Sequence, residues 1–181
     1  ADGNRITAEE MEYDGNTERG IARRNVVLTD PKQTNKTETL YYDKIPNTAY
    51  FNTGGTIYSN DGSVMYTKTA TYYLNTKMID FIGRSNIETD KYTIVSDNIK
   101  TNQNTGVSDF FGPTTIRAKE NPRNYVYTEL GTHNSKTGES FLNKNSRIHY
   151  NEKVLTGDKL YFNRNTGFGK GNGNVTLDDP N

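Results

Sequence analysis

The sequence predicts an all-β protein, a folded-sheet array of about six two-stranded repeats of ~30 residues each. Three observations lead to this fold class. A short motif recurs six times in register. The chain holds 13 Tyr and 7 Phe at a net charge of +0, and aromatic and β-branched side chains suit the half-buried surface of a sheet. No stretch shows sustained helical periodicity.

The repeated motif reads apolar, any, small, acidic, any, apolar, any, aromatic, and an Asn-Thr turn follows it. The copies occupy residues 6–17, 35–48, 65–76, 94–105, 126–137 and 155–166. Their small residues, 29 to 32 positions apart, are Ala8, Thr37, Thr67, Ser96, Thr128 and Gly157. Chance could make one motif position similar in all six copies, but it would not make several positions similar at the same spacing. The last copy is the best preserved.

Each motif continues into a second alternating segment. Eleven positions after the turn Thr an aliphatic residue recurs, at Leu28, Ile87, Ile116, Ile148 and Leu177, and the second copy departs with Ile57. Seven positions after the same Thr, glycine recurs at Gly55, Gly83, Gly112 and Gly173, where we expect a bulge or tight bend. Asp30-Pro31, Asp61-Gly62 and Asn121-Pro122 mark turns between units. Each unit is therefore expected to run strand, turn, strand, turn.

Side-chain parity predicts a bend within each motif. The first apolar residue and the small residue share a face, and so do the second apolar residue and the aromatic one. The two apolar residues, however, are five positions apart, which places them on opposite faces of a regular strand. If all four point inward, the strand must bulge beside the acidic residue, and we predict that it does. The alternative is that the second pair lies on the outer face.

The domain expectation is a single repeat domain spanning residues 1–181. No linker divides the chain, and Asn and Thr are spread throughout. Residues 174–180 repeat the pattern of residues 25–31, which lead directly into the second copy. The sequence therefore stops where another repeat would begin, and a fragment of a longer array stays open as an alternative.

Composition excludes several classes of protein. There is no Cys, which excludes disulfides and thiolate metal sites. No apolar run is long enough to span a membrane, and the balanced charge argues against a nucleic-acid partner. Ala1 begins without a charged and apolar leader, so we expect either that the protein is not exported or that its signal has been removed.

Catalytic and metal-binding patterns are not found in the sequence. His133 occupies the aromatic position of the fifth copy, and His149 alternates like an exposed strand residue; the pair lacks a metal-ligand spacing. The acidic column at positions 9, 38, 97, 129 and 158 is interpreted as a bend or turn feature, with a calcium site as the alternative. Residues 167–173 are glycine-rich but precede no helix, which indicates a narrow or flexible edge. We expect no enzyme activity, no cofactor and no metal.

The repeats resemble the OstA-like family of periplasmic lipopolysaccharide-transport proteins, which includes LptA, LptC and the N-terminal part of LptD. The resemblance is clearest at Leu155-Thr-Gly157-Asp158-Lys-Leu160 and at residues 94–99. It implies an open, twisted β-jellyroll in the periplasm of a Gram-negative bacterium. It also implies end-to-end stacking with other OstA-like proteins or with further copies of itself, and an apolar interior that holds the acyl chains of lipid A.

The expected function is accordingly a non-enzymatic carrier or bridge for lipopolysaccharide with a continuous apolar groove. The residues expected to line it are Ile6, Met11, Leu40, Met65, Ile87, Ile94, Ile99, Ile116, Val126, Ile148, Leu155, Leu160 and Phe162. The alternative is a cell-envelope β-solenoid that binds glycan or protein through exposed Tyr side chains, and a pectin-lyase-type enzyme comes third. Inward-pointing Tyr13, Tyr42, Tyr72 and Phe162 favour lipid, whereas a row of exposed rings favours glycan.

Overall fold

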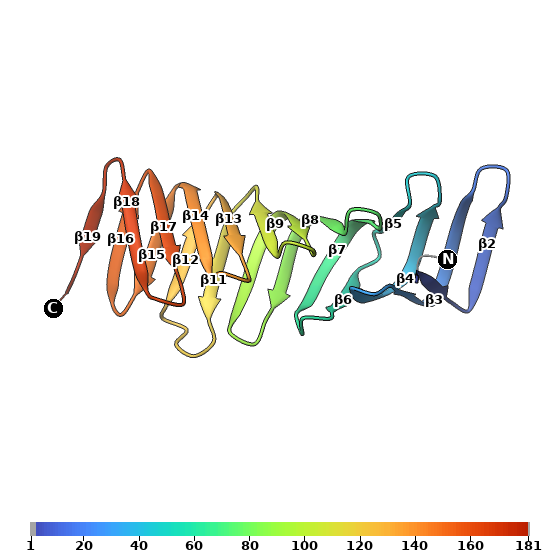
Figure 1. Ribbon diagram of the computed structural model, residues 1–181, viewed down its shortest axis with the longest axis horizontal. Helices are drawn as coiled ribbons and strands as arrows, with labels where there is room; N and C mark the ends of the chain where they lie inside the picture. The colour runs from blue at the N-terminus through green and yellow to red at the C-terminus, as the bar shows by residue number, and fades with distance from the viewer. Residues whose placement is uncertain (1–2, 181) are drawn as a thin grey trace.

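The computed structural model describes residues 3–180, and within them the regular structure is entirely β. The strands form one elongated 19-stranded sheet with the termini at opposite ends (Figure 1). They are β1 (Arg5–Thr7), β2 (Glu10–Asp14), β3 (Arg19–Thr29), β4 (Gln33–Asp43), β5 (Thr48–Phe51), β6 (Gly55–Ser59), β7 (Val64–Tyr73), β8 (Met78–Glu88), β9 (Tyr92–Asn102), β10 (Val107–Phe110), β11 (Thr114–Ala118), β12 (Tyr125–Thr128), β13 (Leu130–Asn134), β14 (Glu139–Lys144), β15 (Ser146–Tyr150), β16 (Lys153–Gly157), β17 (Lys159–Asn163), β18 (Phe168–Asn172) and β19 (Thr176–Asp178).

The sheet is folded lengthwise into two arms. The first arm pairs β2, β3, β4, β5, β7, β8, β9, β10, β13, β14, β17 and β18 in that order. The second arm pairs β1, β3, β4, β6, β7, β8, β9, β11, β12, β15, β16 and β19. The five long strands cross from one arm to the other. Between residues 3 and 180 the pairings are antiparallel, which makes the parallel-coil form of the solenoid alternative wrong.

The arms meet along a crease at the acidic column, where the sequence predicts a bend. The ladder register shifts there between Arg23 and Val26, between Phe81 and Arg84, and between Leu130 and Gly131. In the fourth copy the first apolar residue, the small residue, the second apolar residue and the residue at the aromatic position are all buried. The predicted bend is confirmed, and the outer-face alternative is wrong.

Small hydroxyl side chains line the inside of the crease. Thr67 accepts a hydrogen bond from Ser85 across 2.8 Å, Ser96 and Thr114 lie 2.5 Å apart, and Thr128 and Ser146 lie 2.8 Å apart. The two arms converge at this line, so a long side chain has no room. Paired hydroxyls satisfy one another where water is excluded. This explains why the third motif position is always small.

The acidic column has a structural role on the outside of the crease. Asn145, between β14 and β15, donates to Glu129 at 2.9 Å, and Asn174, between β18 and β19, donates to Asp158 at 3.0 Å. These asparagines have φ of 45° and 48°, a left-handed conformation that Asn tolerates better than most residues. Within the part of the chain that the structure describes, no group of three or more His, Cys, Asp or Glu is arranged to hold a metal ion.

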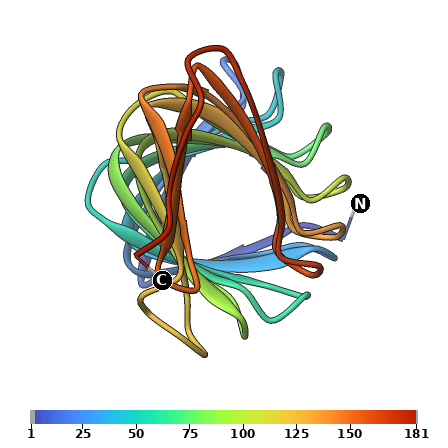
Figure 2. The same cartoon turned by 90° about the vertical axis from the view of Figure 1, so that its left-hand side faces the viewer.

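The predicted hairpin turns form the far edges of the arms. In three of them an Asn three residues before the turn Thr caps the turn, as Asn102 does by accepting from the backbone N–H groups of Asn104 and Thr105 at 2.9 and 3.1 Å. Asn163 and Asn134 repeat this arrangement. Viewed along the long axis, the sheet curls around that axis and successive hairpins are rotated relative to one another (Figure 2), as expected for the twist of a β-sheet.

Candidate functional site

The inner face of the second arm carries one continuous line of side chains, which we call the aliphatic ladder. Antiparallel partners point to the same face of a sheet, so the register defines its members. In order they are Ile6, Leu28, Asn35, Ile57, Met65, Ile87, Ile94, Ile116, Val126, Ile148, Leu155 and Leu177. Each described copy of the repeat contributes to it, and Asn35 is its one polar member.

The inner face of the first arm carries two further lines. The line nearer the crease, the first-arm row, consists of Met11, Ala22, Leu40, Phe51, Ala70, Phe81, Ile99, Phe110, Gly131, Leu142, Leu160 and Gly171. The outer line holds the aromatic position of each motif and includes Tyr13, Tyr42, Tyr72, His133 and Phe162. All thirteen residues expected to line the groove therefore lie on the inner face, eight of them in the aliphatic ladder.

Sequence reasoning missed half of the first-arm row. Phe81, Phe110 and Leu142 are at most 2% exposed and come from the second strand of their units. A signal was present, because each lies five positions after a turn Thr, as Ala22 and Gly171 also do. Large rings in this row pair with small neighbours, for example Phe81 with Ala70, so the arms can pack closely.

Burial is uneven along the groove. Ten of the expected residues are buried in the middle of the fold, where the two inner faces pack against each other. Ile6 and Leu155 are half-buried, and Met11 is 52% exposed. The exposure of Met11 follows from its place on β2, the last strand of the first arm in the described structure, where no further strand covers it.

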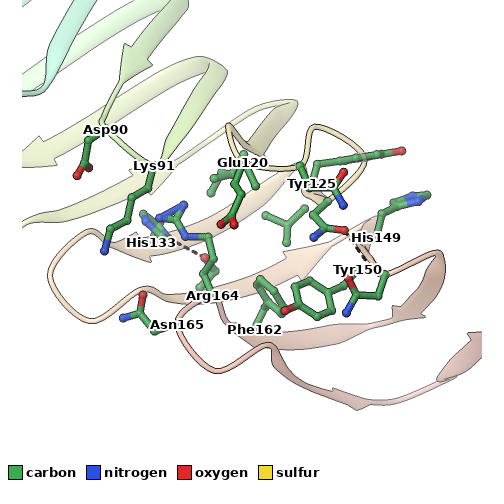
Figure 3. Close-up of a pocket in the computed structure, with 17 residues that line it drawn as sticks. Asp90, Lys91, Glu120, Tyr125, His133, His149, Tyr150, Phe162, Arg164 and Asn165 are labelled. Carbon is green, nitrogen blue, oxygen red and sulfur yellow. Dashed lines mark hydrogen bonds between the residues drawn. The ribbon is translucent and has the colours of Figure 1, made fainter.

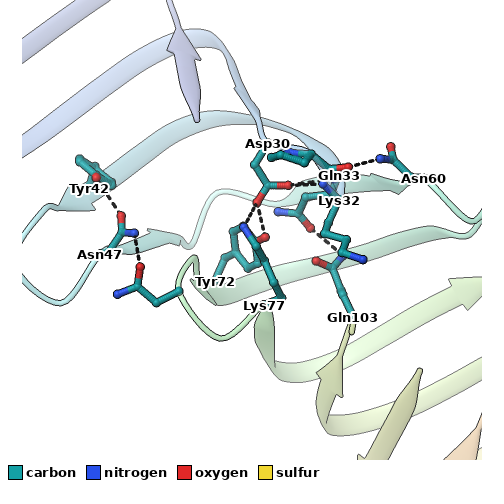
Figure 4. A network of polar contacts seen from close by, with 11 residues as sticks. Asp30, Lys32, Gln33, Tyr42, Asn47, Asn60, Tyr72, Lys77 and Gln103 are labelled. Carbon is teal, nitrogen blue, oxygen red and sulfur yellow. Dashed lines mark hydrogen bonds and ion pairs between the residues drawn. The ribbon is translucent and has the colours of Figure 1, made fainter. Parts of the chain in front are cut away.

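Polar side chains bridge the two arms at their open edge, which we call the mouth. Asp30, in the β3–β4 turn of the second arm, accepts a hydrogen bond from Lys77 of the first arm at 3.0 Å and another from Tyr72 (Figure 4). Gln103 donates to Gln33 across the same gap at 2.9 Å. Hydrogen-bonded groups therefore connect the arms beside the aliphatic ladder, so the space between the arms is not lined by apolar side chains alone.

A second bridge joins the arms farther along the mouth. His133 of the first arm contacts Ser140 through Nδ1 at 2.7 Å and the Tyr92 hydroxyl of the second arm through Nε2 at 3.1 Å. Burial, with a smaller contribution from the charge of Arg164, lowers the pKa of His133 from 6.5 to about 4. His133 is therefore neutral at physiological pH, and its buried, doubly bonded ring agrees with the interpretation as a place-holder for an aromatic residue.

His149 differs from its expected role as an exposed strand residue. Its ring stacks on Tyr125 with centroids 4.2 Å apart, and its Nε2 is buried. Burial, followed by the charges of Arg147 and Arg117, lowers the pKa of His149. The correction has a simple cause: Tyr125 lies directly opposite in the ladder, a cross-strand neighbour that alternation within one strand does not reveal.

Two adjoining cavities of about 810 Å³ and 570 Å³ open at the mouth. The apolar floor includes Ile116, Val126 and Phe162 in the larger cavity and Met65, Ile87 and Ile94 in the smaller one. Polar residues from the turns of both arms form the rim. Figure 3 shows the larger cavity with Arg164 near its centre. Such a site can hold an apolar chain below a polar group.

Each end of the fold presents unpaired strand edges. Among the described strands, β1 and β2 pair only with β3, and β18 and β19 pair only with β17 and β16. Exposed apolar side chains accompany these edges, including Tyr13 at one end and Val175 and Leu177 at the other. Open edges of this kind are ready to pair with another chain. Residues 3–180 contain no helix long and apolar enough to cross a membrane.

Comparison with known proteins agrees with this architecture. The family model described as OstA-like protein matches residues 1–97, more than half of the 181-residue chain. The crystal structure of LptH from Pseudomonas aeruginosa, described as the LptA homologous periplasmic component of the conserved lipopolysaccharide transport device, shares the fold. The similarity has a TM-score of 0.50 at 16% identity and covers 55% of this chain and 76% of that chain. No curated protein sequence matches. The chain, with its six jellyroll repeats, belongs to the OstA-like protein family.

Proposed function

We propose that this protein is a non-enzymatic carrier or bridge for lipopolysaccharide in the periplasm of a Gram-negative bacterium. Membership of the OstA-like family supports the proposal, as does the fold shared with a periplasmic component of a lipopolysaccharide transport device. The observation that carries it is the aliphatic ladder, which extends from Ile6 near one end of the fold to Leu177 near the other.

The physical basis is the burial of hydrocarbon. An acyl chain gains roughly 0.8 kcal/mol for each CH₂ group that leaves water for an apolar surface. Because the aliphatic ladder has almost the same chemistry at every position, the free energy of binding an acyl chain is similar along its length. An acyl chain can therefore shift from one repeat to the next. The polar Asn35 and the bridges at the mouth divide this path into segments.

Lipid in the central segment requires the arms to move apart. Ile99, Phe110 and Leu142 are at most 1% exposed, so the protein's own side chains fill the interior there. In the proposed mechanism acyl chains enter where inner residues are exposed, at the ends and at the mouth, and then replace side-chain contacts between the arms. The hydrogen-bonded bridges open as the lipid passes.

The proposed bridge forms by strand addition at the ends. An edge strand of a second OstA-like protein, or of another copy, pairs with β1 and β2 or with β18 and β19, a recognition mode based on main-chain hydrogen bonds. Met11 and Leu177, on the inner face at opposite ends, then become covered by the partner. The track of one molecule thus continues into the next.

Photo-crosslinking to lipopolysaccharide tests the proposal with matched pairs of neighbours. Probes are placed at Met11, Ile99 and Leu177 on the inner face, and the controls occupy Glu12, Lys100 and Asp178, the next residue in each strand and exposed on the outer face. We expect strong labelling at each inner position and little at its neighbour. Equal labelling within all three pairs would refute lipid carriage, and circular dichroism checks that each variant is folded.

The direction of the motif rings supports the lipid proposal over the glycan-binding alternative. Tyr72 and Phe162 are 1% and 6% exposed, and Tyr42 is half-buried. Tyr13 is exposed but belongs to the same inner line, at the end of the sheet. These four rings share the inner line and do not form an exposed stacking platform.

A further inference from the structure

Arg164 is a cation that the fold places at the mouth without satisfying it. It lies in the β17–β18 turn of the first arm, and its guanidinium carbon is 3.7 Å from the ring centroid of Tyr92 in the second arm. Its Nη1 atom is buried and has no hydrogen-bond partner within residues 3–180. Guanidinium N–H groups are hydrogen-bond donors, so this arrangement leaves a donor without an acceptor beside the cavities that Arg164 lines.

The surroundings of Arg164 are amphipathic. It lines both mouth cavities, together with Asp90, Lys91, His133 and Asn165. The larger cavity also contains the carboxylate of Glu120, and no ion pair joins Arg164 to either acid in the described structure. Figure 3 shows Lys91 and Asp90 on one side of Arg164 and Glu120 on the other. The apolar floor lies against the same space.

The energetics favour an anion at this position. A desolvated cation without a hydrogen-bonded partner is unfavourable. Burial lowers the pKa of Arg164, and the charge of Asp90 opposes this shift. His133 is neutral for the same physical reason, so it does not repel a second cation nearby. An arginine presents paired N–H groups that match the oxygens of a phosphate or carboxylate. Lys91, exposed on the opposite turn, supplies a mobile second charge.

We propose that the mouth between the β9 start and the β17–β18 turn is a subsite for the phosphate headgroup of an amphiphile. Arg164 binds the phosphate, Lys91 closes on it, and Ile116, Val126 and Phe162 hold the first part of the acyl chain. The inference rests on the proposed function and deepens it, because it assigns the anionic end of the lipid to one repeat boundary.

Binding of short-chain soluble probes tests the subsite directly. Isothermal titration compares dihexanoyl phosphatidic acid, dihexanoylglycerol and inorganic phosphate on the wild-type chain, on Arg164→Gln and on Arg147→Gln. Arg147 is the matched control, because its guanidinium also stacks on a tyrosine, Tyr127, at 4.4 Å but on an exposed strand position. We expect Arg164→Gln to weaken the binding of dihexanoyl phosphatidic acid about ten- to a hundredfold, which is the range for the loss of a hydrogen bond to a charged group. Dihexanoylglycerol should be unaffected, and Arg147→Gln should match wild type.

Several outcomes would overturn the subsite. One is that wild type and Arg164→Gln bind phosphatidic acid with equal affinity. Another is that Arg164→Gln loses as much affinity for the uncharged dihexanoylglycerol as for phosphatidic acid. Inorganic phosphate binding as tightly as phosphatidic acid would show a free-phosphate site. If Arg164→Gln does not fold, Lys91→Gln provides the test, because the exposed Lys91 side chain can be replaced without unfolding the protein. A severalfold loss of affinity for phosphatidic acid, with unchanged affinity for dihexanoylglycerol, supports the subsite. Unchanged affinity for phosphatidic acid refutes it. If lipopolysaccharide crosslinks at Leu177 but Arg164→Gln binds phosphatidic acid like wild type, the proposed lipid transport stands and only this subsite is rejected.

Discussion

The bridge between Asp30, Tyr72 and Lys77 provides the sharpest test of how the arms are held together. The Asp30 side chain is 0% exposed, and Lys77 is 19% exposed. We consider Asp30→Asn, which keeps the shape of the side chain. Its Oδ1 can still accept from the backbone N–H groups of Lys32 and Gln33, now at 2.7 and 3.0 Å, so the local turn is preserved. What is lost is the negative charge that faces Tyr72 and Lys77.

The expected cost is large for one substitution. Removing one partner of a buried ion pair typically costs 3–5 kcal/mol, and we take about 3 kcal/mol because Lys77 can turn partly toward water. For a chain of this length that corresponds to a fall in Tm of about 6–12 °C. The matched control is Glu88→Gln, which breaks a 2.9 Å pair with Lys119 whose side chains are 49% and 42% exposed. Exposed pairs contribute about 0–1 kcal/mol.

Urea unfolding followed by far-UV circular dichroism measures both variants. Repeat arrays need not unfold in a single step, so hydrogen exchange of the β3–β4 and β7–β8 hairpins should accompany it. We expect exchange to rise in these hairpins in Asp30→Asn and to stay unchanged in Glu88→Gln. If the two variants lose the same stability, burial does not strengthen this bridge, and the reasoning about the mouth is wrong.

Three further predictions concern the interior. The pKa of His133 is lowered from 6.5 to about 4 in the folded protein. Between these two pH values the unfolded chain therefore binds more protons than the folded one. The free energy of unfolding should fall by about 3 kcal/mol as the pH drops through this window, and it should level off below pH 4. His133→Gln should remove this component, seen as the difference between the two stability–pH curves, and parallel curves would contradict it. Gly131→Ala places a Cβ 2.7 Å from a backbone oxygen and should cost about 1–3 kcal/mol in a thermal melt, whereas Gly15→Ala, with nothing within 4 Å, should be near neutral; equal melts would refute the close approach. Phe110→Ala should lose about 3–5 kcal/mol in urea unfolding, and Phe111→Ala, whose ring is 51% exposed, about 0.5 kcal/mol or less; equal losses would mean that Phe110 does not support the core.

Local rules were sufficient for much of the fold. The motif defines the repeat, its turns and its inward side chains, because parity along a strand and the conformational preferences of Asn and Gly act over a few residues. Parity, together with the expectation that all four motif residues point inward, also predicted the bend at the acidic residue, and the register shift between Phe81 and Arg84 is an instance of it. The same rules identified the inner-face residues that the proposed groove uses.

Contacts between distant residues decided the rest. The pairing of Asp30 with Lys77, of Gln33 with Gln103 and of Tyr92 with Arg164 joins residues that are 47 or more positions apart in the sequence. No periodic pattern encodes these pairs, because the two members of each pair belong to different repeats.

The sequence by itself determined a repeating β-unit, its inward face and the bend that folds the sheet into two arms. Only the tertiary structure decided how closely those arms approach each other. That distance depends on the sum of packing at the crease, large rings beside small residues, and hydrogen bonds across the mouth. It filled the centre of the open jellyroll with side chains, placed polar bridges across the mouth and left an unsatisfied arginine at its edge.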